Sequence, residues 1–356
     1  MAADNLHRNS KAPRAAGLPA SSGRISRAGI IDIVCNLYTP NEVKQGQTGI
    51  DDHFKTQVRM AGGAKGGVTI PNYLKMMDKA GIEHSLLIAA RCGDRRIKGS
   101  TFIPYESVEA VCKKYPARFS GLAGVDPTLG MQQLEELEYA VKELGFVGAH
   151  FYPHWFDIAP DAPRAYPIYA KCCELDISIM MQVGHNLVYS RERRLPSVAQ
   201  PIKLDRVAID FPDLKLLGIH LGVPWTDEMI SMCWKHENIY TAGDAYAPKH
   251  WPKQMVHYAN TYGSHKFLFG TDWPVIDPIR AVEEVKALNF RPESYKKIMR
   301  ENALSIFKIP GSKGYKKPKP FKAPTKSLAS KPAAKTVKVA KKKAAPARKK
   351  VVRKKR

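Results

Sequence analysis

Between residues 30 and 307 the chain repeats one unit eight times, a short apolar run followed by an amphipathic segment with helical spacing. The apolar runs cover residues 30–37, 85–90, 120–125, 147–152, 177–184, 215–220, 239–243 and 266–270. The amphipathic segments cover residues 71–80, 104–115, 131–144, 167–174, 200–210, 226–236, 252–262 and 279–288. Eight strand–helix units predict a closed (β/α)8 TIM barrel. No Gly-rich phosphate turn follows the first run, which disfavours an open doubly wound sheet and a nucleotide cofactor.

The charge of the chain is concentrated at its ends. The formal net charge is +24, and residues 312–356 contribute +19 of it through 19 Lys or Arg and no acid. Residues 1–28 contribute +4, which leaves +1 for residues 29–311. We therefore predict a disordered segment 1–28, a nearly neutral barrel 29–311, and a disordered, polybasic Lys/Ala/Pro-rich tail 312–356. The tail is expected to bind nucleic acid or another polyanion without sequence preference, or to act only as a solubilising extension.

The remaining bulk properties fit a cytoplasmic protein. No apolar run is long enough to span a bilayer, and the six cysteines lack metal-binding spacing. Residues 39–68 form an unusually long connection after the first strand, and long loops at this place often cover a substrate. The basic tail adds the expectation of association with the nucleoid.

Three of the apolar runs end on a residue that can carry chemistry. His185 follows the fifth run, His220 ends the sixth, and Asp272 comes two residues after the eighth. The carboxyl ends of barrel strands converge on one mouth, so these side chains should approach one another despite their separation in sequence. Imidazole and carboxylate together can bind a divalent metal or transfer protons. The sequence therefore predicts an active site with His185, His220 and Asp272 as catalytic residues.

Several phrases resemble the amidohydrolase-related family, in the branch of aminocarboxymuconate-semialdehyde decarboxylase, resorcylate decarboxylases and lactone hydrolases. The similarity runs from about residue 30 to residue 307 and rests on GLAGVDP (121–127), GFVGAHFYP (145–153), FGTDWP (269–274) and ENALSIF (301–307). The resemblance implies that His185 matches a metal ligand and His220 a histidine that orients or protonates substrate. Asp272 then matches an aspartate that binds metal and often activates water. Family members are usually dimers, so a homodimer is expected.

The first strand departs from this family. The family's Asp-x-His-x-His becomes Asp32-Ile-Val-Cys-Asn36, with Val34 and Asn36 at the two metal-binding positions. Valine cannot ligate a metal, and an asparagine carbonyl is a poor zinc ligand. Only His185 and Asp272 remain as normal ligands, fewer than the three protein ligands of a typical catalytic zinc site. A tightly bound zinc or manganese ion is therefore doubtful, although His150 could substitute as a ligand.

Other residues are candidates for binding substrate. His150 lies near the end of the fourth run and His154 two residues after it, and both are interpreted mainly as pocket residues, together with Asn36. Arg91 follows the second run and either grips a substrate carboxylate or stays solvated beside Asp94 and Arg95. Two further candidates are Tyr246 and Trp273, and Asp244 either lines the pocket or caps a helix.

The sequence predicts an enzyme that acts on a small carboxylated, cyclic or aromatic-derived compound. The reaction is hydrolysis of a lactone or another C–O or C–N bond, or a decarboxylation. The altered first strand favours hydrolysis with a weakly bound or absent metal, with Asp272 as the base that activates water. The alternative is a catalytically reduced barrel that serves as a nucleic-acid-associated or scaffolding protein through its tail.

Overall fold

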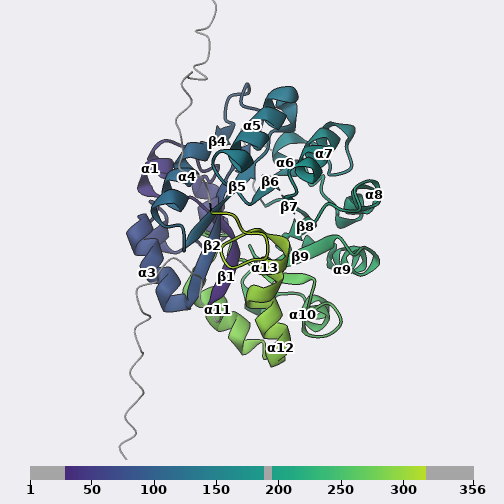
Figure 1. Cartoon of the computed structure of the whole chain (residues 1–356). Helices are drawn as coiled ribbons and strands as arrows, with labels where there is room; N and C mark the ends of the chain where they lie inside the picture. The colour runs from purple at the N-terminus through teal and green to yellow at the C-terminus, as the bar shows by residue number, and fades with distance from the viewer. Residues whose placement is uncertain (1–28, 188–194, 318–356) are drawn as a thin grey trace, which may run out of the picture. The chain divides into compact units, whose positions relative to one another are not determined.

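The computed structural model describes residues 29–187 and 195–317 (Figure 1). Eight parallel strands form one sheet in the order β1-β2-β5-β6-β7-β8-β9-β10. The strands are β1 (Ile30–Asn36), β2 (Ile82–Ala89), β5 (Phe119–Gly124), β6 (Gly148–Phe151), β7 (Ser178–Gln182), β8 (Leu216–Ile219), β9 (Ile239–Gly243) and β10 (Phe267–Phe269). Each strand pairs with the next one along the sheet, which confirms the predicted TIM barrel. Residues 1–28 and 318–356 lie outside the described residues, and with them the prediction for segment 1–28 and most of the predicted tail 312–356.

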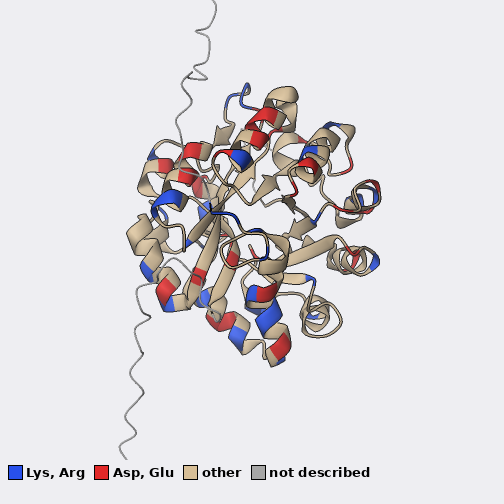
Figure 2. Ribbon diagram, in the orientation of Figure 1, with Lys and Arg blue, Asp and Glu red and all other residues tan. Residues whose placement is uncertain are grey.

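A helix follows each of these strands and covers the outside of the sheet (Figure 1). In chain order these helices are α3 (Ile70–Ala80), α4 (Tyr105–Lys114), α5 (Met131–Lys142), α7 (Tyr166–Glu174), α8 (Leu204–Asp210), α9 (Thr226–Lys235), α10 (Lys253–Asn260) and α11 (Pro278–Ala287). Three further pieces end the described fold, namely α12 (Pro292–Lys296), a π-helical turn (Lys297–Glu301) and α13 (Asn302–Ile306). Acidic and basic residues are interspersed over these helices (Figure 2), and the net charge of residues 29–311 is +1.

The barrel is closed between its first and last strands by the turn after β10. Cys35 and Trp273 form a parallel bridge, and Asn36 N donates to Trp273 O at 2.9 Å. Gly270 allows this approach, because a Cβ at this position would lie 2.8 Å from Val34 Cγ2. The end of β10 therefore packs directly against the end of β1. This closure brings the ends of β1 and β10 into contact, and with them Asn36 and Asp272.

The core lies inside the barrel and between the strands and the helices. The strands are built from apolar residues that are almost entirely buried, such as Ile31, Leu86 and Leu217 with 0% exposure. Strands buried on both faces read as continuous apolar runs, which explains why sequence runs predicted them well. The polar residues at the strand ends are therefore the groups that can contact a substrate.

The connection from β1 to α3 folds over the mouth of the barrel. It contains two short helices, α1 (Pro40–Lys44) and α2 (Asp52–Gln57), and a 3-10 turn (Gly62–Ala64). After β2 a small hairpin follows, formed by β3 (Arg91–Cys92) and β4 (Thr101–Phe102). A short helix α6 (Pro153–Phe156) follows β6. In the described part of the chain, no helix combines the length and the apolar character needed to cross a bilayer.

Candidate active site

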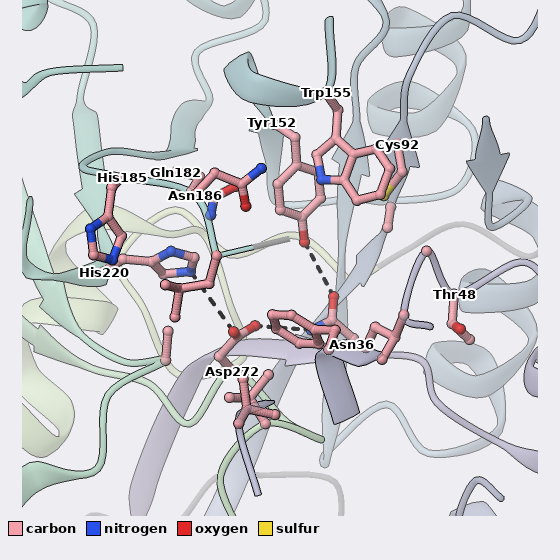
Figure 3. A pocket seen from close by; sticks show the side chains of 18 of the residues that line it. Asn36, Thr48, Cys92, Tyr152, Trp155, Gln182, His185, Asn186, His220 and Asp272 are labelled. Atoms are coloured by element: carbon pink, nitrogen blue, oxygen red, sulfur yellow. Dashed lines mark hydrogen bonds and ion pairs between the residues drawn. The ribbon is translucent and has the colours of Figure 1, made fainter. Parts of the chain in front are cut away.

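A pocket opens at the carboxyl ends of the strands (Figure 3). Its polar lining comes mainly from strand ends and the loops after them, and the β1–α3 connection adds Ile50, Phe54 and Val58 to its apolar lining. The lining residues are Asn36, Thr48, Gly49, Ile50, Phe54, Val58, Ala90, Cys92, Tyr152, Trp155, Gln182, His185, Asn186, Leu187, His220, Ala245, Tyr246, Asp272 and Val275. Five predicted site residues, His185, His220, Asp272, Asn36 and Tyr246, are therefore brought to one pocket. The segment 39–68 contributes to its wall, as expected for a substrate-covering loop.

Asp272 is held at the pocket by the turn that follows β10. Its own backbone has a positive φ of 52°, a conformation that L-residues rarely adopt. The turn is fixed from β1, because Asp32 accepts from Thr271 N at 3.0 Å and from Thr271 Oγ1 at 2.6 Å. Trp273 N donates to Thr271 Oγ1 at 3.0 Å. These hydrogen bonds hold the turn in place. They therefore support the positive φ of Asp272, whose side chain lines the pocket.

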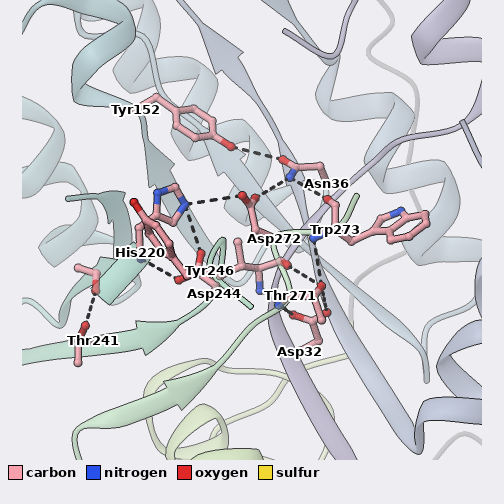
Figure 4. Close-up of polar contacts among 12 residues, drawn as sticks. Asp32, Asn36, Tyr152, His220, Thr241, Asp244, Tyr246, Thr271, Asp272 and Trp273 are labelled. Carbon is pink, nitrogen blue, oxygen red and sulfur yellow. Dashed lines mark hydrogen bonds and ion pairs between the residues drawn. The ribbon is translucent and has the colours of Figure 1, made fainter. Parts of the chain in front are cut away.

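The Asp272 carboxyl group accepts a hydrogen bond from a neutral amide. Asn36 Nδ2 donates to Asp272 Oδ1 at 3.1 Å, and Tyr152 OH donates to Asn36 Oδ1 at 3.3 Å (Figure 4). Burial raises the pKa of Asp272 to about 7, whereas the Asn36 hydrogen bond lowers it and the neighbouring Asp32 raises it. A carboxyl group with such a pKa exchanges a proton readily near neutral pH. Asp272 is therefore suited to act as a general acid or base.

His220 lies next to Asp272 and is held from β9. His220 Nε2 is 3.3 Å from Asp244 Oδ2 and 3.9 Å from Asp272 Oδ2, and His220 N donates to Asp244 Oδ1 at 2.7 Å. Burial lowers the pKa of His220 to about 3, with smaller contributions from His154 and His185. Burial and the charge of Asp272 raise the pKa of Asp244 well above its usual range. Asp244 does not cap a helix. The carboxyl groups of Asp244 and Asp272 both lie near His220 Nε2.

His185 faces the same pocket together with a tyrosine. The hydroxyl of Tyr246 lies 2.9 Å from His185 Nε2, and Trp251 Nε1 donates to Tyr246 O at 2.9 Å. Gly184 precedes His185 with a φ of 99°, and a Cβ there would lie 2.3 Å from Val223 O. Burial lowers the pKa of His185. This pair can present a hydroxyl or an imidazole N–H to an oxygen of a bound molecule.

The structure does not bring the remaining predicted residues to the pocket lining. His150 is fully buried, its ring lies 4.1 Å from the ring of Tyr152, and burial lowers its pKa to about 3. His154 Nδ1 lies 3.1 Å from Pro196 O and 3.2 Å from Val198 N, so it ties the loop after β6 to the loop after β7.

Arg91 and Trp273 also lie outside the pocket lining. Arg91 pairs with Glu136 on α5 at 3.0 Å and stacks over Tyr105 at 4.5 Å. The Trp273 ring is buried and packs against Tyr73 at 5.0 Å. Both side chains make contacts within the fold, and neither is among the residues that line this pocket.

The sequence analysis did not identify Tyr152 and Gln182 as pocket residues. It also did not predict the contact between Asp244 and His220. Tyr152 and Gln182 lie inside or directly beside apolar runs, and such runs give no sign of which member faces the mouth. Asp244 ends its run in the same way as the predicted catalytic residues do. This position is the available sequence signal, and it leaves open whether Asp244 lines the pocket or caps a helix.

The described residues do not fit a protein-bound divalent metal. Within residues 29–187 and 195–317, no group of three or more His, Cys, Asp or Glu is arranged to hold an ion. At the end of β1, Val34 packs toward Gly270, and Asn36 turns an N–H donor rather than an oxygen toward Asp272. A donor at this place competes with a cation for the same carboxylate oxygen. In this structure neither Val34 nor Asn36 offers a metal ligand to Asp272 at the end of β1.

Comparisons with known proteins agree with this architecture. A family model described as amidohydrolase matches residues 96–309, more than half of the chain. The match begins after β1 and β2, so it leaves out the strand whose metal-binding motif is altered. A curated gamma-resorcylate decarboxylase from Rhodococcus jostii (strain RHA1) is 23% identical over 253 residues, which cover 56% of this chain and 73% of that protein.

Solved structures show the same fold. An uncharacterised TIM-barrel protein from Bordetella bronchiseptica superposes with a TM-score of 0.65 at 24% identity and covers 78% of this chain and 98% of its own. A dihydroxybenzoic acid decarboxylase from Polaromonas sp. JS666, with bound manganese and the inhibitor 2-nitroresorcinol, gives a TM-score of 0.57 at 19% identity and covers 78% and 96%. With the family match, the barrel and the polar strand ends, these findings lead to one conclusion. The chain belongs to the amidohydrolase-2 family and is an enzyme of its hydrolase or carboxy-lyase kind.

Proposed function

We propose that this enzyme is a carboxy-lyase that removes the carboxylate from a small hydroxylated aromatic acid, with Asp272 as the proton donor. The observation that carries this proposal is the Asp272 carboxyl group, which lies at the pocket with a pKa raised to about 7. At neutral pH a substantial fraction of such a group is protonated and can act as an acid. The decarboxylase relatives support the choice of aromatic acids as substrates.

The reaction needs one proton and releases one molecule of carbon dioxide. The Asp272 carboxyl group gives its proton to the ring carbon that bears the carboxylate. The bond from this carbon to the carboxylate then breaks, its electron pair restores the aromatic ring, and carbon dioxide leaves. Asp272 is left ionised and regains a proton from water. Asn36 keeps the carboxyl group oriented through the 3.1 Å bond to Oδ1.

The walls of the pocket suit a flat ring with polar substituents. Phe54 and Trp155 supply aromatic surface, and Gln182 and Asn186 supply neutral hydrogen-bonding groups. Tyr246 and His185 are placed to contact a ring hydroxyl or a carboxylate oxygen, since their 2.9 Å pair lines the same cavity. Pockets for small molecules commonly combine apolar walls with a few polar groups in this way.

We propose that the chemistry proceeds without a metal held by the protein. The donor set supports this part of the proposal, because Val34 and Asn36 occupy the end of β1 and Asn36 hydrogen-bonds Asp272. Among the structural relatives, the Polaromonas decarboxylase carries manganese. In this chain Asp272 is present, whereas the two metal-binding positions of β1 are occupied by Val34 and Asn36.

Hydrolysis of a lactone or a related cyclic ester is the second candidate. The observation that favours it is the Tyr246–His185 pair, which can donate to the oxyanion that forms when water attacks a carbonyl. Asp272 would then act as a base and take a proton from the attacking water. The same residues are used in both reactions, but the required protonation state of Asp272 is opposite.

Incubation of the full-length protein with hydroxybenzoates and with lactones separates the candidates. The proposal expects carbon dioxide and the matching phenol from at least one hydroxybenzoate, and loss of this activity in Asp272→Asn. Ring opening of a lactone without release of carbon dioxide from any acid would establish the second candidate instead. The alternative, a nucleic-acid-associated or scaffolding role through the tail 312–356, concerns a segment that lies mostly outside the described part of the chain, and it stays a prediction.

A further inference from the structure

The connection between β1 and α3 presents an apolar stripe to the pocket. The stripe consists of Ile50, Phe54 and Val58, which are spaced by four residues and all line the pocket. Residues spaced in this way lie on one face of a helix, and α2 runs through the middle of the stripe. The other residues of α2 are all polar, namely Asp52, His53, Lys55, Thr56 and Gln57. The apolar side of this helix therefore borders the cavity.

The protein itself does not fully cover this stripe. No residue of α2 is buried, and Ile50 and Val58 at the two ends of the stripe are only partly buried. The next helix along the chain, α3, differs, because its Tyr73 and Met77 are buried with 2% and 0% exposure. Single exposed apolar residues are common on protein surfaces. Three of them on one helix face that borders a pocket form a surface that a bound apolar group can remove from water.

The stripe is held in place by contacts before, at and after α2. Gly49 has a φ of 68°, and a Cβ at this position would lie 3.1 Å from Cys92 Sγ, so the backbone before α2 packs closely against β3. Asp51 caps α2, since its Oδ1 accepts from Phe54 N at 2.7 Å. Met60, just beyond the helix, is buried with 4% exposure. These contacts fix the helix on both sides, so its apolar face forms a preformed wall of the pocket.

This wall begins at the end of the pocket that is remote from the histidines. Figure 3 shows His185 and His220 on one side of Asp272, and Thr48 and Cys92 on the other side. Thr48 comes two residues before the first residue of the stripe. In the proposed reaction, the ring carbon that takes the proton lies at Asp272, and oxygen substituents of the ring contact His185. The ring edge that is turned away from these groups therefore points to the end of the pocket that holds the stripe.

We infer that Ile50, Phe54 and Val58 form a specificity wall that selects substrates with an alkyl substituent on the ring edge remote from the reacting carboxylate. The inference rests on the proposed function and narrows its substrate class from hydroxylated aromatic acids to alkyl-substituted ones. An alkyl group at this edge leaves water and covers the stripe, which is favourable. A charged or hydroxyl substituent at the same edge loses hydration and meets side chains that offer no hydrogen bond.

Substitutions in the specificity wall change its size without altering the proton-transferring groups. Phe54→Ala and Val58→Ala remove apolar surface from the wall, whereas Val58→Phe fills the space in front of it. Val43→Ala is the matched control for Val58→Ala. Val43 lies on α1 in the same connection and is also partly buried, but it is not among the residues that line the pocket. Thermal unfolding of each variant confirms that binding is compared on folded protein.

The direct measurement is a ligand-detected NMR titration of the full-length protein with phenol and with 3-alkyl- and 4-alkylphenols that carry methyl, ethyl or propyl groups. These phenols have no carboxylate and no ester bond, so binding is measured without turnover. In the wild type and in Val43→Ala, affinity for at least one series should rise roughly fourfold with each CH₂ group. Phe54→Ala, Val58→Ala and Val58→Phe should each lower the affinity for the propylphenol by roughly five- to tenfold, and that for phenol by less than about twofold.

Two results would overturn the inference. One is an affinity that does not rise with alkyl length in either series. The other is an equal loss of phenol and propylphenol binding in Phe54→Ala, because this side chain would then cover the ring itself. Failure of the proposed function has a different signature, namely no carbon dioxide from any hydroxybenzoate while propylphenol still binds through the wall. In an active enzyme, Phe54→Ala should lower kcat/KM for an alkyl-substituted hydroxybenzoate chiefly through a higher KM.

Discussion

At the mouth of the barrel, the end of β1 and the ends of β8 and β10 meet around one carboxyl group but contribute different chemistry. β8 and β10 lead to His220 and Asp272, which lie 3.9 Å apart. β1 contributes Val34 and Asn36, an apolar side chain and a neutral amide. In the proposed mechanism, the ends of β8 and β10 supply the groups that transfer protons, and the end of β1 orients Asp272 through the Asn36 hydrogen bond.

The largest effect is expected when the carboxyl group of Asp272 is replaced. Asp272→Asn should lower kcat/KM by roughly a hundred- to ten-thousand-fold, the usual contribution of a general acid or base. Thermal unfolding should occur at an unchanged or higher temperature, because an ionised buried carboxylate costs free energy. Asp213→Asn, an exposed aspartate, is the matched control. Activity close to wild type in Asp272→Asn would remove this residue from the mechanism.

The pH dependence of kcat/KM sharpens the role of Asp272. Burial raises its pKa to about 7. If Asp272 gives a proton, the active form is the protonated one, and the rate should fall about tenfold per pH unit above this pKa. If it takes a proton from water, the rate should instead fall about tenfold per unit below it. A profile that declines on the alkaline side supports decarboxylation, and one that declines on the acidic side supports hydrolysis.

A smaller effect is expected from the β1 side. Asn36→Leu removes the donor to Asp272 Oδ1, and this hydrogen bond lowers the Asp272 pKa. The pH inflection should therefore move upward, by on the order of one unit, with a smaller change in maximal kcat. Asn72→Leu on the exposed face of α3 is a control that should leave the inflection in place. A downward or absent shift would show that Asn36 does not set this pKa.

The least effect on catalysis is expected at Arg91. Its pairing with Glu136 at 3.0 Å places it outside the pocket, so Arg91→Met should leave KM for an aromatic acid within about twofold of the wild type. Stability should fall by about 1–3 kcal/mol, because the largely buried Glu136 loses a partner. Arg96→Met is the control, since its pair with Asp94 is exposed and should contribute little. A tenfold rise in KM would restore Arg91 as a substrate-binding residue.

The fold and three of its strand ends could be predicted from the sequence. Continuous apolar runs mark strands that are buried on both faces, and His185, His220 and Asp272 stand at the points where these runs stop. Parallel barrel geometry then brings them together without further information. The same logic identified Asn36 and Tyr246 as pocket residues.

The remaining details depend on local geometry that residue patterns do not encode. Arg91 follows its strand as a site residue would, but its side chain turns outward to Glu136. The contact of Asp244 with His220 depends on left-handed backbone at His220 and Leu221, two residue types that rarely adopt it. Tyr152 reaches Asn36 across the barrel mouth, a contact between residues separated by more than a hundred positions.

The most direct test of the account is activity after complete removal of metal. The full-length protein would be treated with a chelator, its zinc and manganese content measured, and carbon dioxide release from its best hydroxybenzoate assayed with and without added manganese. The account predicts an unchanged kcat in metal-free protein, because Asp272 supplies the proton and Asn36 holds it in place. Loss of activity that stoichiometric manganese restores would contradict it, and would mean that the β1 side still contributes to a metal site.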